Sequence, residues 1–231
     1  METRLIKAVV FDLDGTLIDS AEDLCTALNR LLAEEALRPL ALSEVVPMIG
    51  DGAARLVERG VLAAGGHVGA GSLPVLTRRF LSHYEPHAAE RTRAVPGAAE
   101  VLAELAADGL LLAICTNKPE QATRAILAAL DLERHFGAVI GGDSVPGRPK
   151  PDPAMVLAAI DRLGVAPHEA VMVGDARNDV LAARAAGLPV LLRSGGYTSV
   201  PAEDLGADGV FADFADLAAA IAALPQAALA S

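Results

Sequence analysis

LIKAVVFDLDGT, residues 5–16, joins an apolar run to a pair of carboxylates, and this stretch decides the fold. Continuous hydrophobicity over residues 5–11 is typical of a buried strand, and Asp12 and Asp14 follow at its carboxyl end. At about 4 Å and an effective dielectric constant of about 20, two such charges repel by about 4 kcal/mol. The Gly-Thr pair behind them supplies no counter-charge. The motif therefore indicates that a cation or reaction chemistry compensates the repulsion, with an acidic surface turn as the alternative.

The composition is that of a globular protein, and it limits the possible partners. Of the 231 residues, 52% are hydrophobic and 21% are charged, which is enough for a large core. No apolar run approaches the roughly eighteen residues of a membrane helix, and we expect no signal peptide. The net charge of −11 opposes binding to nucleic acid and to acidic membranes. We therefore expect a cytoplasmic protein with neither of these partners.

Two residue types are scarce enough to be informative. Cys25 and Cys115 are far apart and fit no metal or redox spacing, which favours a reducing compartment. The chain has three lysines among its 19 basic residues, namely Lys7, Lys118 and Lys150. Because arginine so dominates, each retained lysine raises the question of what it does.

Further short apolar runs predict buried strands, and their continuous hydrophobicity favours parallel strands that are covered on both faces. These runs are residues 110–115, 137–141, 170–174 and 189–192. Segments with helical spacing lie between them, and glycines such as Gly164 and Gly187 are expected to end two of these helices. Alternation of this kind predicts an α/β fold with a doubly wound, Rossmann-like parallel sheet. Its active crevice should lie at the carboxyl ends of the strands.

Residues 18–92 interrupt this alternation, because they show helical patterns and no convincing strand. A helix is predicted to begin at Ser20 with Asp23 completing a capping box, and two more are predicted over 53–63 and 73–84. Inserted directly after the first strand, such a segment would lie above the crevice. We therefore expect a discontinuous α/β core of residues 1–17 and 93–231 with an all-helical cap of residues 18–92.

Polar groups follow each later strand, at the edge of the sheet where Asp12 and Asp14 lie. Thr116 and Asn117 follow the second predicted strand, and a proline-rich segment carrying Lys150 follows the third. Asp175 and Asp179 follow the fourth. Helix capping or a solvated lysine would explain any one of them, but their arrival at one edge predicts a catalytic site.

The four strand ends together resemble the motifs of the haloacid dehalogenase superfamily, and the match spans essentially the whole chain. The resemblance implies that Asp12 is a nucleophile that forms an aspartyl-phosphate, and that Asp14 is the general acid and base. It also implies that Thr116 and the amide of Asn117 bind phosphate oxygens and that Lys150 neutralises charge. The substrate would be a small phosphate ester.

A Mg²⁺ ion is the cofactor that this resemblance implies. Its ligands would be Asp12, the backbone carbonyl of Asp14, and Asp175. Asp179 would complete the metal site by acting on metal-bound water or by orienting its neighbours. All of these donors are oxygen atoms, which favours Mg²⁺ over zinc. A calcium loop is excluded because Leu17 occupies the position where that loop needs glycine.

Within the superfamily, residues 49–53 and 141–143 look like those of bacterial phosphoglycolate phosphatases. We therefore expect hydrolysis of 2-phosphoglycolate to glycolate and phosphate. The substrate carboxylate would be met by the helix N-terminus at Gly52 and by Arg55, with Arg59 as the alternative.

Other functions stay open at this point. Asp14 argues against a dehalogenase, and the absence of lysine between Lys7 and Lys118 excludes a Schiff-base phosphonate hydrolase. A sugar phosphomutase and a pyrophosphatase of the same superfamily share the motifs. A non-catalytic binding module is the alternative of a different class. The protein is expected to be a monomer or a homodimer.

Overall fold

A central six-stranded sheet organises the computed structural model, which describes residues 6–224. All strands are parallel, in the order β5-β4-β1-β6-β7-β8. Their bounds are β1 Ala8–Phe11, β4 Leu111–Cys115, β5 Ala138–Ile140, β6 Ala170–Gly174, β7 Val190–Arg193 and β8 Gly209–Phe211. The five predicted strands are confirmed, except that residue 5 of the first lies outside the described residues. Strand β8 was missed because a three-residue Gly-Val-Phe run carries no periodic signal.

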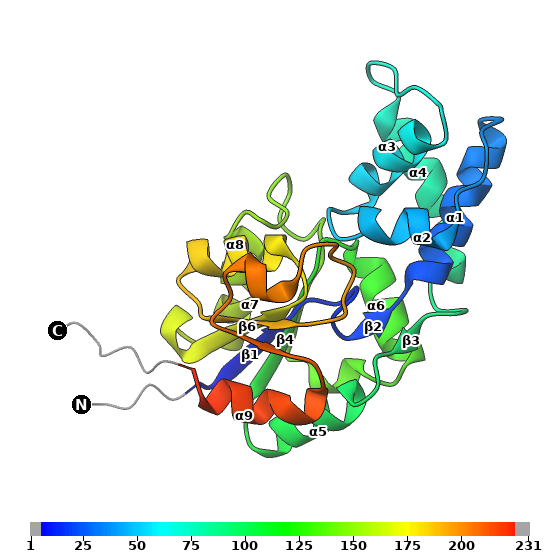
Figure 1. The fold of residues 1–231 in the computed structure, drawn as a ribbon. Helices are drawn as coiled ribbons and strands as arrows, with labels where there is room; N and C mark the ends of the chain where they lie inside the picture. The colour runs from blue at the N-terminus through cyan, green and yellow to red at the C-terminus, as the bar shows by residue number, and fades with distance from the viewer. Residues whose placement is uncertain (1–5, 225–231) are drawn as a thin grey trace.

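Helices cover both faces of the sheet, as continuous apolar strands require. Val9 and Phe11 face a core that includes side chains of α5 (Ala98–Ala107), α6 (Glu120–Ala129) and α9 (Leu217–Ala222). Ala8 and Val10 face a second core formed with α7 (Ala154–Leu163) and α8 (Arg177–Ala186). Figure 1 shows α5 and α9 on one side of the strands, with α7 and α8 on the other. The predicted doubly wound α/β fold is therefore confirmed.

Two glycines end the helices of the second core, as predicted. Gly164 and Gly187 follow α7 and α8 with φ of 70° and 78°, the left-handed conformation that favours glycine. At the other end of α8, the carboxylate of Asp179 accepts a hydrogen bond from the Ala176 N–H at 3.0 Å. Asp179 thus caps this helix at its N-terminus.

The order of the strands determines where the site forms. From β1 the chain proceeds to β4 and β5 on one side, and it then returns to β6 on the other side of β1. Ligands of open α/β sheets bind at such a reversal, outside the carboxyl ends of the strands. Asp12 and Asp175 directly follow β1 and β6. The topology therefore brings together two carboxylates that are far apart in the sequence.

The segment after β1 forms a group of helices that lies apart from the sheet in Figure 1. These helices are α1 (Ala21–Glu34), α2 (Leu42–Val45), α3 (Ala53–Ala63) and α4 (Leu73–Tyr84). The predicted helices over 53–63 and 73–84 are confirmed. Helix α4 packs against both α1 and α3, and the buried face includes Leu28, Val57 and Phe80.

The expectation of no strand in residues 18–92 was wrong at one end. Strand β2 (Ile18–Asp19) pairs antiparallel with β3 (Arg93–Ala94). The two segments that connect the helical insertion to the sheet thus form a short ribbon. Two-residue strands leave no periodic pattern in a sequence, so only the pairing reveals them.

The predicted capping box of α1 was also wrong, because both of its side chains have other partners. Ser20 Oγ donates to Asp14 Oδ1 at 2.5 Å, and the structure shows no cap from Ser20. The buried Asp23 carboxylate accepts hydrogen bonds from the Arg91 N–H at 3.0 Å and from the Thr92 N–H at 2.9 Å. The Thr92 hydroxyl donates to it at 2.8 Å. Asp23 therefore ties α1 to the segment that returns to the sheet.

Replacing Asp23 should destabilise the protein. Asp23→Ala leaves the Arg91 and Thr92 backbone N–H groups without their acceptor, so the free energy of unfolding should fall by about 2–3 kcal/mol. Urea unfolding followed by circular dichroism measures this difference. The matched control is Glu22→Ala, because Glu22 is the neighbouring exposed acid and its ion pair with Arg91 is long at 3.3 Å. Equal losses for both variants would contradict the role assigned to Asp23.

Candidate active site

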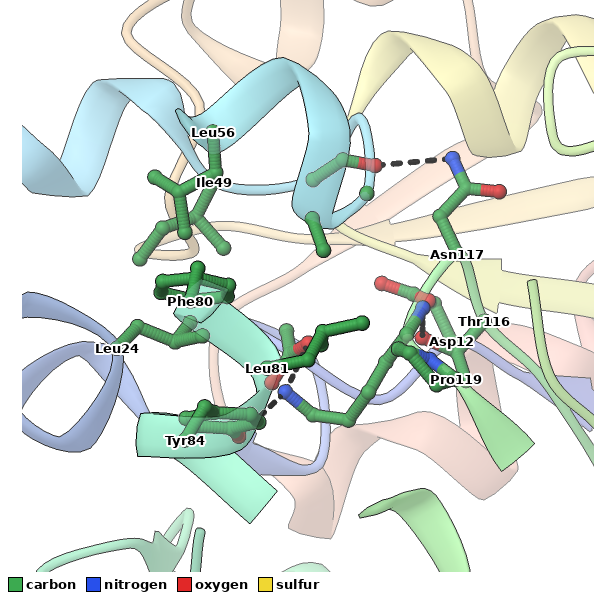
Figure 2. Close-up of a pocket in the computed structure, with 15 residues that line it drawn as sticks. Asp12, Leu24, Ile49, Leu56, Phe80, Leu81, Tyr84, Thr116, Asn117 and Pro119 are labelled. Atoms are coloured by element: carbon green, nitrogen blue, oxygen red, sulfur yellow. Dashed lines mark hydrogen bonds and ion pairs between the residues drawn. The ribbon is translucent and has the colours of Figure 1, made fainter. Parts of the chain in front are cut away.

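The carboxyl ends of the strands assemble the predicted core residues into one buried site. Asp12 follows β1, Thr116 and Asn117 follow β4, and Asp175 follows β6. Lys150 comes from the loop between β5 and α7. Apart from Asn117 at 8% exposure and Asp12 at 7%, these residues are at most 4% exposed. Figure 2 shows Asp12, Thr116 and Asn117 on the same side of a pocket.

Lys150 lies between two carboxylates. Its Nζ is 2.7 Å from Asp12 Oδ1 and 2.6 Å from Asp179 Oδ1. Burial lowers the pKa of Lys150, but the attraction of Asp12 and Asp179 outweighs this and raises the pKa above its ordinary value. The ammonium group is therefore a fixed positive charge next to Asp12.

The Asn117 side chain holds this lysine in place. Its Oδ1 accepts from the Lys150 N–H at 2.8 Å, and its Nδ2 donates to the Lys150 carbonyl at 3.0 Å. The same Nδ2 donates to the Gly50 carbonyl at 3.0 Å. Sequence reasoning assigned Asn117 to phosphate binding, but the structure uses its side-chain amide to position Lys150 and the loop at Gly50.

Asp12, Asp175 and Asp179 form an acidic cluster that could hold a metal ion, since one oxygen of each lies within 4.8 Å of the others. Burial raises the pKa of Asp175 to about 8, with repulsion from Asp12 and Asp179 adding to the shift. Burial also raises the pKa of Asp12 to about 6, although Lys150 opposes it. One lysine therefore does not balance the charge of the cluster, and a divalent cation would.

The surroundings of Asp175 and Asp179 fit this interpretation. Asp175 accepts from the Thr16 hydroxyl at 3.1 Å and from the Tyr197 N–H at 2.8 Å. A Cβ on Gly196 would lie 2.2 Å from Asp175 Oδ2, so only glycine allows this close approach. Asp179 uses one oxygen for Lys150 and the other for the Asp175 and Ala176 N–H groups. Asp179 thus contacts three protein donors, whereas Asp175 contacts two.

The Asp14 carboxylate points away from this cluster. It accepts from Ser20 Oγ at 2.5 Å, and its Oδ2 lies 2.8 Å from Lys118 Nζ. Its side chain is not part of the acidic cluster, so only its backbone carbonyl remains as the expected metal ligand. The sequence indicated repulsion between the carboxylates of Asp12 and Asp14. In the structure each of them pairs with a different lysine, Asp12 with Lys150 and Asp14 with Lys118.

Lys118 and Tyr84 are two residues of the site that sequence reasoning missed. The Lys118 side chain is 2% exposed, and its Nζ donates to the Tyr84 hydroxyl at 2.8 Å. Tyr84 is the last residue of α4, so this contact joins the helical insertion to the end of β4. The scarcity of lysine was the one signal that could have pointed to Lys118.

The two residues predicted to recognise a substrate carboxylate are separated. Gly52 lines the pocket next to Asn117, as does Leu56. Arg55 lines none of the described pockets, and its 63%-exposed side chain pairs with Glu58 at 2.6 Å. Arg55 and Leu56 are three and four residues after Gly52, so spacing along the helix does not distinguish them, and it is the pairing with Glu58 that holds Arg55 on the exposed side. Arg59, the alternative, pairs with Asp51 at a second, wider opening.

Two adjoining cavities meet at Asp12 and Asp14. The smaller has a volume of about 40 Å³ and extends between Lys118 and the helical insertion. In Figure 2, Leu24, Phe80 and Tyr84 line the side of the pocket opposite Thr116 and Asn117. The larger has a volume of about 350 Å³ and is lined by the acidic cluster, Lys150 and Arg59, among others.

The chain is similar to known proteins. The family model of haloacid dehalogenase-like hydrolases matches residues 6–187, which confirms the resemblance seen in the strand ends. A phosphoglycolate phosphatase from Caulobacter vibrioides is 46% identical over 209 residues, which are 90% of this chain and 88% of the relative. One from Rhodospirillum rubrum is 46% identical over 215 residues, which are 91% of this chain and 89% of the relative.

A solved structure resembles the whole chain. The crystal structure of a predicted phosphoglycolate phosphatase from Haemophilus somnus has a TM-score of 0.87 and 32% sequence identity. The match covers 96% of this chain and 100% of that one, so it includes both the sheet and the helical insertion. Within residues 6–224, every helix is too short or too polar to span a membrane.

Asp175 should make the metal-free protein less stable as the pH rises. The folded chain keeps the Asp175 proton up to a pKa of about 8, whereas the unfolded chain loses it near the ordinary value of 3.8. Unfolding therefore releases a proton between these values, and a higher pH favours unfolding. Asp175→Asn removes this effect. The Tm of the variant minus that of the parent protein, both measured in EDTA, should therefore increase from about pH 5 to about pH 8.

Differential scanning fluorimetry measures this gain. It should be at least about 3 °C, because each pH unit in this window costs up to about 1.4 kcal/mol and 1 kcal/mol corresponds to roughly 2–4 °C in a chain of this size. Asp204→Asn, at an exposed acid, is the matched control and should follow the parent protein. A constant difference in Tm between Asp175→Asn and the parent at all pH values would contradict the raised pKa.

Proposed function

Because the chain belongs to the haloacid dehalogenase-like hydrolases, we propose that it hydrolyses 2-phosphoglycolate to glycolate and phosphate with Mg²⁺ as its cofactor. It is a phosphoric monoester hydrolase, and the names of its relatives support this substrate. One observation carries the chemistry: Lys150 lies between Asp12 and Asp179, and the carboxylate of Asp175 clusters with those two.

Asp12 is the proposed nucleophile. Lys150 holds its Oδ1, and this orients Oδ2 to attack phosphorus and form the aspartyl-phosphate. The bond between phosphorus and the ester oxygen breaks as the new bond forms. The Thr116 hydroxyl accepts from the Lys118 N–H at 3.3 Å, so its own hydrogen can bind a phosphate oxygen.

Asp14 is the proposed acid and base. It lines both cavities, and Ser20 and Lys118 fix its orientation. In the first step it gives a proton to the departing ester oxygen. In the second step it takes a proton from the water that attacks phosphorus, and this releases phosphate and regenerates Asp12.

Asp12 and Asp175 are the side chains that we propose hold Mg²⁺, together with the backbone carbonyl of Asp14. The exclusively oxygen donor set and the uncompensated charge of the cluster support this assignment. When bound, the ion would neutralise charge on the phosphoryl group. Because one Asp179 oxygen contacts the Lys150 ammonium at 2.6 Å and the other accepts from two backbone N–H groups, we assign Asp179 to positioning Lys150 and the start of α8.

We also propose that residues 18–92 act as a cap that excludes bulk water from the core of residues 1–17 and 93–231. Three contacts support a closed arrangement. Asn117 donates to the Gly50 carbonyl at 3.0 Å, Asn178 donates to Asp51 Oδ1 at 2.5 Å, and Lys118 donates to Tyr84. The proposed setting is the cytoplasm, which suits the free and buried Cys25 and Cys115.

Hydrolysis should depend on Asp12 and on Mg²⁺. Asp12→Asn should lower kcat/KM for 2-phosphoglycolate by about a thousandfold or more, because it removes the attacking carboxylate. Release of inorganic phosphate measures this, and EDTA should abolish the activity of the parent protein until Mg²⁺ is restored. Asp204→Asn is the control. Parent activity on pyrophosphate or glucose 1-phosphate with none on 2-phosphoglycolate would overturn the substrate, and no activity at all would favour a binding module.

A further inference from the structure

Lys118 is a buried cation that the proposed catalytic steps do not fully use. Its Nζ contacts Asp14 Oδ2 at 2.8 Å and the Tyr84 hydroxyl at 2.8 Å, and it lies 4.8 Å from the centre of the Tyr84 ring. An ammonium group has three N–H donors. Within residues 6–224, the hydrogen bonds of Nζ account for two of them. One donor is therefore left for a ligand in the small cavity.

We propose that Lys118 determines substrate specificity by binding the carboxylate of the leaving group. This inference rests on the proposed function and assigns to Lys118 the role that the sequence gave to Arg55. The ligand class is a short phosphate ester of a 2-hydroxy carboxylic acid. Its phosphate lies at Asp12, and its carboxylate lies in the small cavity.

The distances agree with the length of such a substrate. In 2-phosphoglycolate one methylene separates the ester oxygen from the carboxyl carbon, so a carboxylate oxygen lies roughly 3 Å from the ester oxygen. Proton donation by Asp14 requires the ester oxygen to lie within about 3 Å of its carboxylate. Lys118 Nζ is 2.8 Å from that same carboxylate. A substrate positioned for protonation can therefore turn its own carboxylate toward Lys118 without moving its ester oxygen from Asp14.

The size and lining of the cavity favour a small anionic group. About 40 Å³ is room for roughly three water molecules, which is comparable to a methylene and a carboxylate. Leu24, Leu56 and Phe80 line it and offer no polar partner. Asp12 and Asp14 also line it, at the side where the phosphate is proposed to lie, and Lys118 is the single basic residue among its described lining residues. Exclusion of water by these apolar walls strengthens the attraction between its ammonium and a carboxylate.

Tyr84 supports the same assignment from the helical insertion. Its hydroxyl accepts from Lys118, which leaves its own hydrogen to donate. Burial raises the pKa of Tyr84 to about 12, so the hydroxyl keeps this hydrogen at neutral pH. The ring stacks on Phe80 with centroids 5.8 Å apart, and this fixes its position. The proposed carboxylate site thus combines Lys118, which follows β4, with Tyr84, which ends α4.

The test compares two substrates of equal length. The first is 2-phosphoglycolate, and the second is 2-hydroxyethyl phosphate, whose leaving group ends in a neutral hydroxyl. Lys118→Met should lower the ratio of their kcat/KM values by about 10- to 100-fold, the loss typical of a buried charge-assisted hydrogen bond. Lys7→Met is the matched control, because Lys7 is exposed and pairs with Glu169, and it should leave the ratio unchanged.

Equal losses on both substrates would overturn the inference, because Lys118 would then act solely by positioning Asp14. A comparable fall in the ratio for Arg59→Met with none for Lys118→Met would also overturn it, and would place the carboxylate at the larger cavity. If Lys118→Met fails to fold, Lys118→Gln decides, because its amide can still donate to Asp14 and a fall in the ratio is again expected. Parent activity on 2-hydroxyethyl phosphate alone would instead overturn the proposed substrate.

Discussion

The structure depends on the buried ion pairs that Lys150 makes with Asp12 and Asp179. Carboxylates from the ends of β1 and β6 and from the first turn of α8 converge within 4.8 Å. Burial and repulsion between the carboxylates raise the pKa of Asp12 and that of Asp175 there. One ammonium offsets part of this cost at 2.7 and 2.6 Å. The Asn117 side chain holds the backbone of Lys150, so the end of β4 determines where this charge lies. The negative charge that remains is what a divalent cation would neutralise.

A second buried lysine gives the neighbouring carboxylate a different environment. Lys118 pairs with Asp14 on the side of the helical insertion, while Lys150 pairs with Asp12 on the side of the acidic cluster. The two carboxylates thus pair with different lysines, although they are two residues apart in the chain and line the same two cavities. This difference in partners would let one motif supply both the proposed nucleophile, next to the acidic cluster, and the proposed acid, next to the leaving group. It also links the acid to α4 through Tyr84.

Strong periodic signals made most of the fold predictable from the sequence. The runs that became β1, β4, β5, β6 and β7 are continuous and apolar, and the helices over 53–63 and 73–84 were placed at the residues that the structure gives. The failures involve weak or non-local signals. The β2-β3 ribbon is two residues long, and the partners of Ser20 and Asp23 come from Asp14 and from residues 91–92. A local motif cannot reveal such competition for hydrogen bonds.

The sequence by itself determined the α/β class and the chemistry of the strand ends, because hydrophobic period and residue type are local properties. It identified Asp12, Lys150, Asp175 and Asp179 as members of one site. Tertiary structure alone decided which lysine meets which carboxylate, that Asn117 positions Lys150, and that Lys118 rather than Arg55 faces the small cavity. The ion pairs depend on which strand ends and loops the topology brings together, and burial and distance set their strength. Neither quantity can be read from residue order.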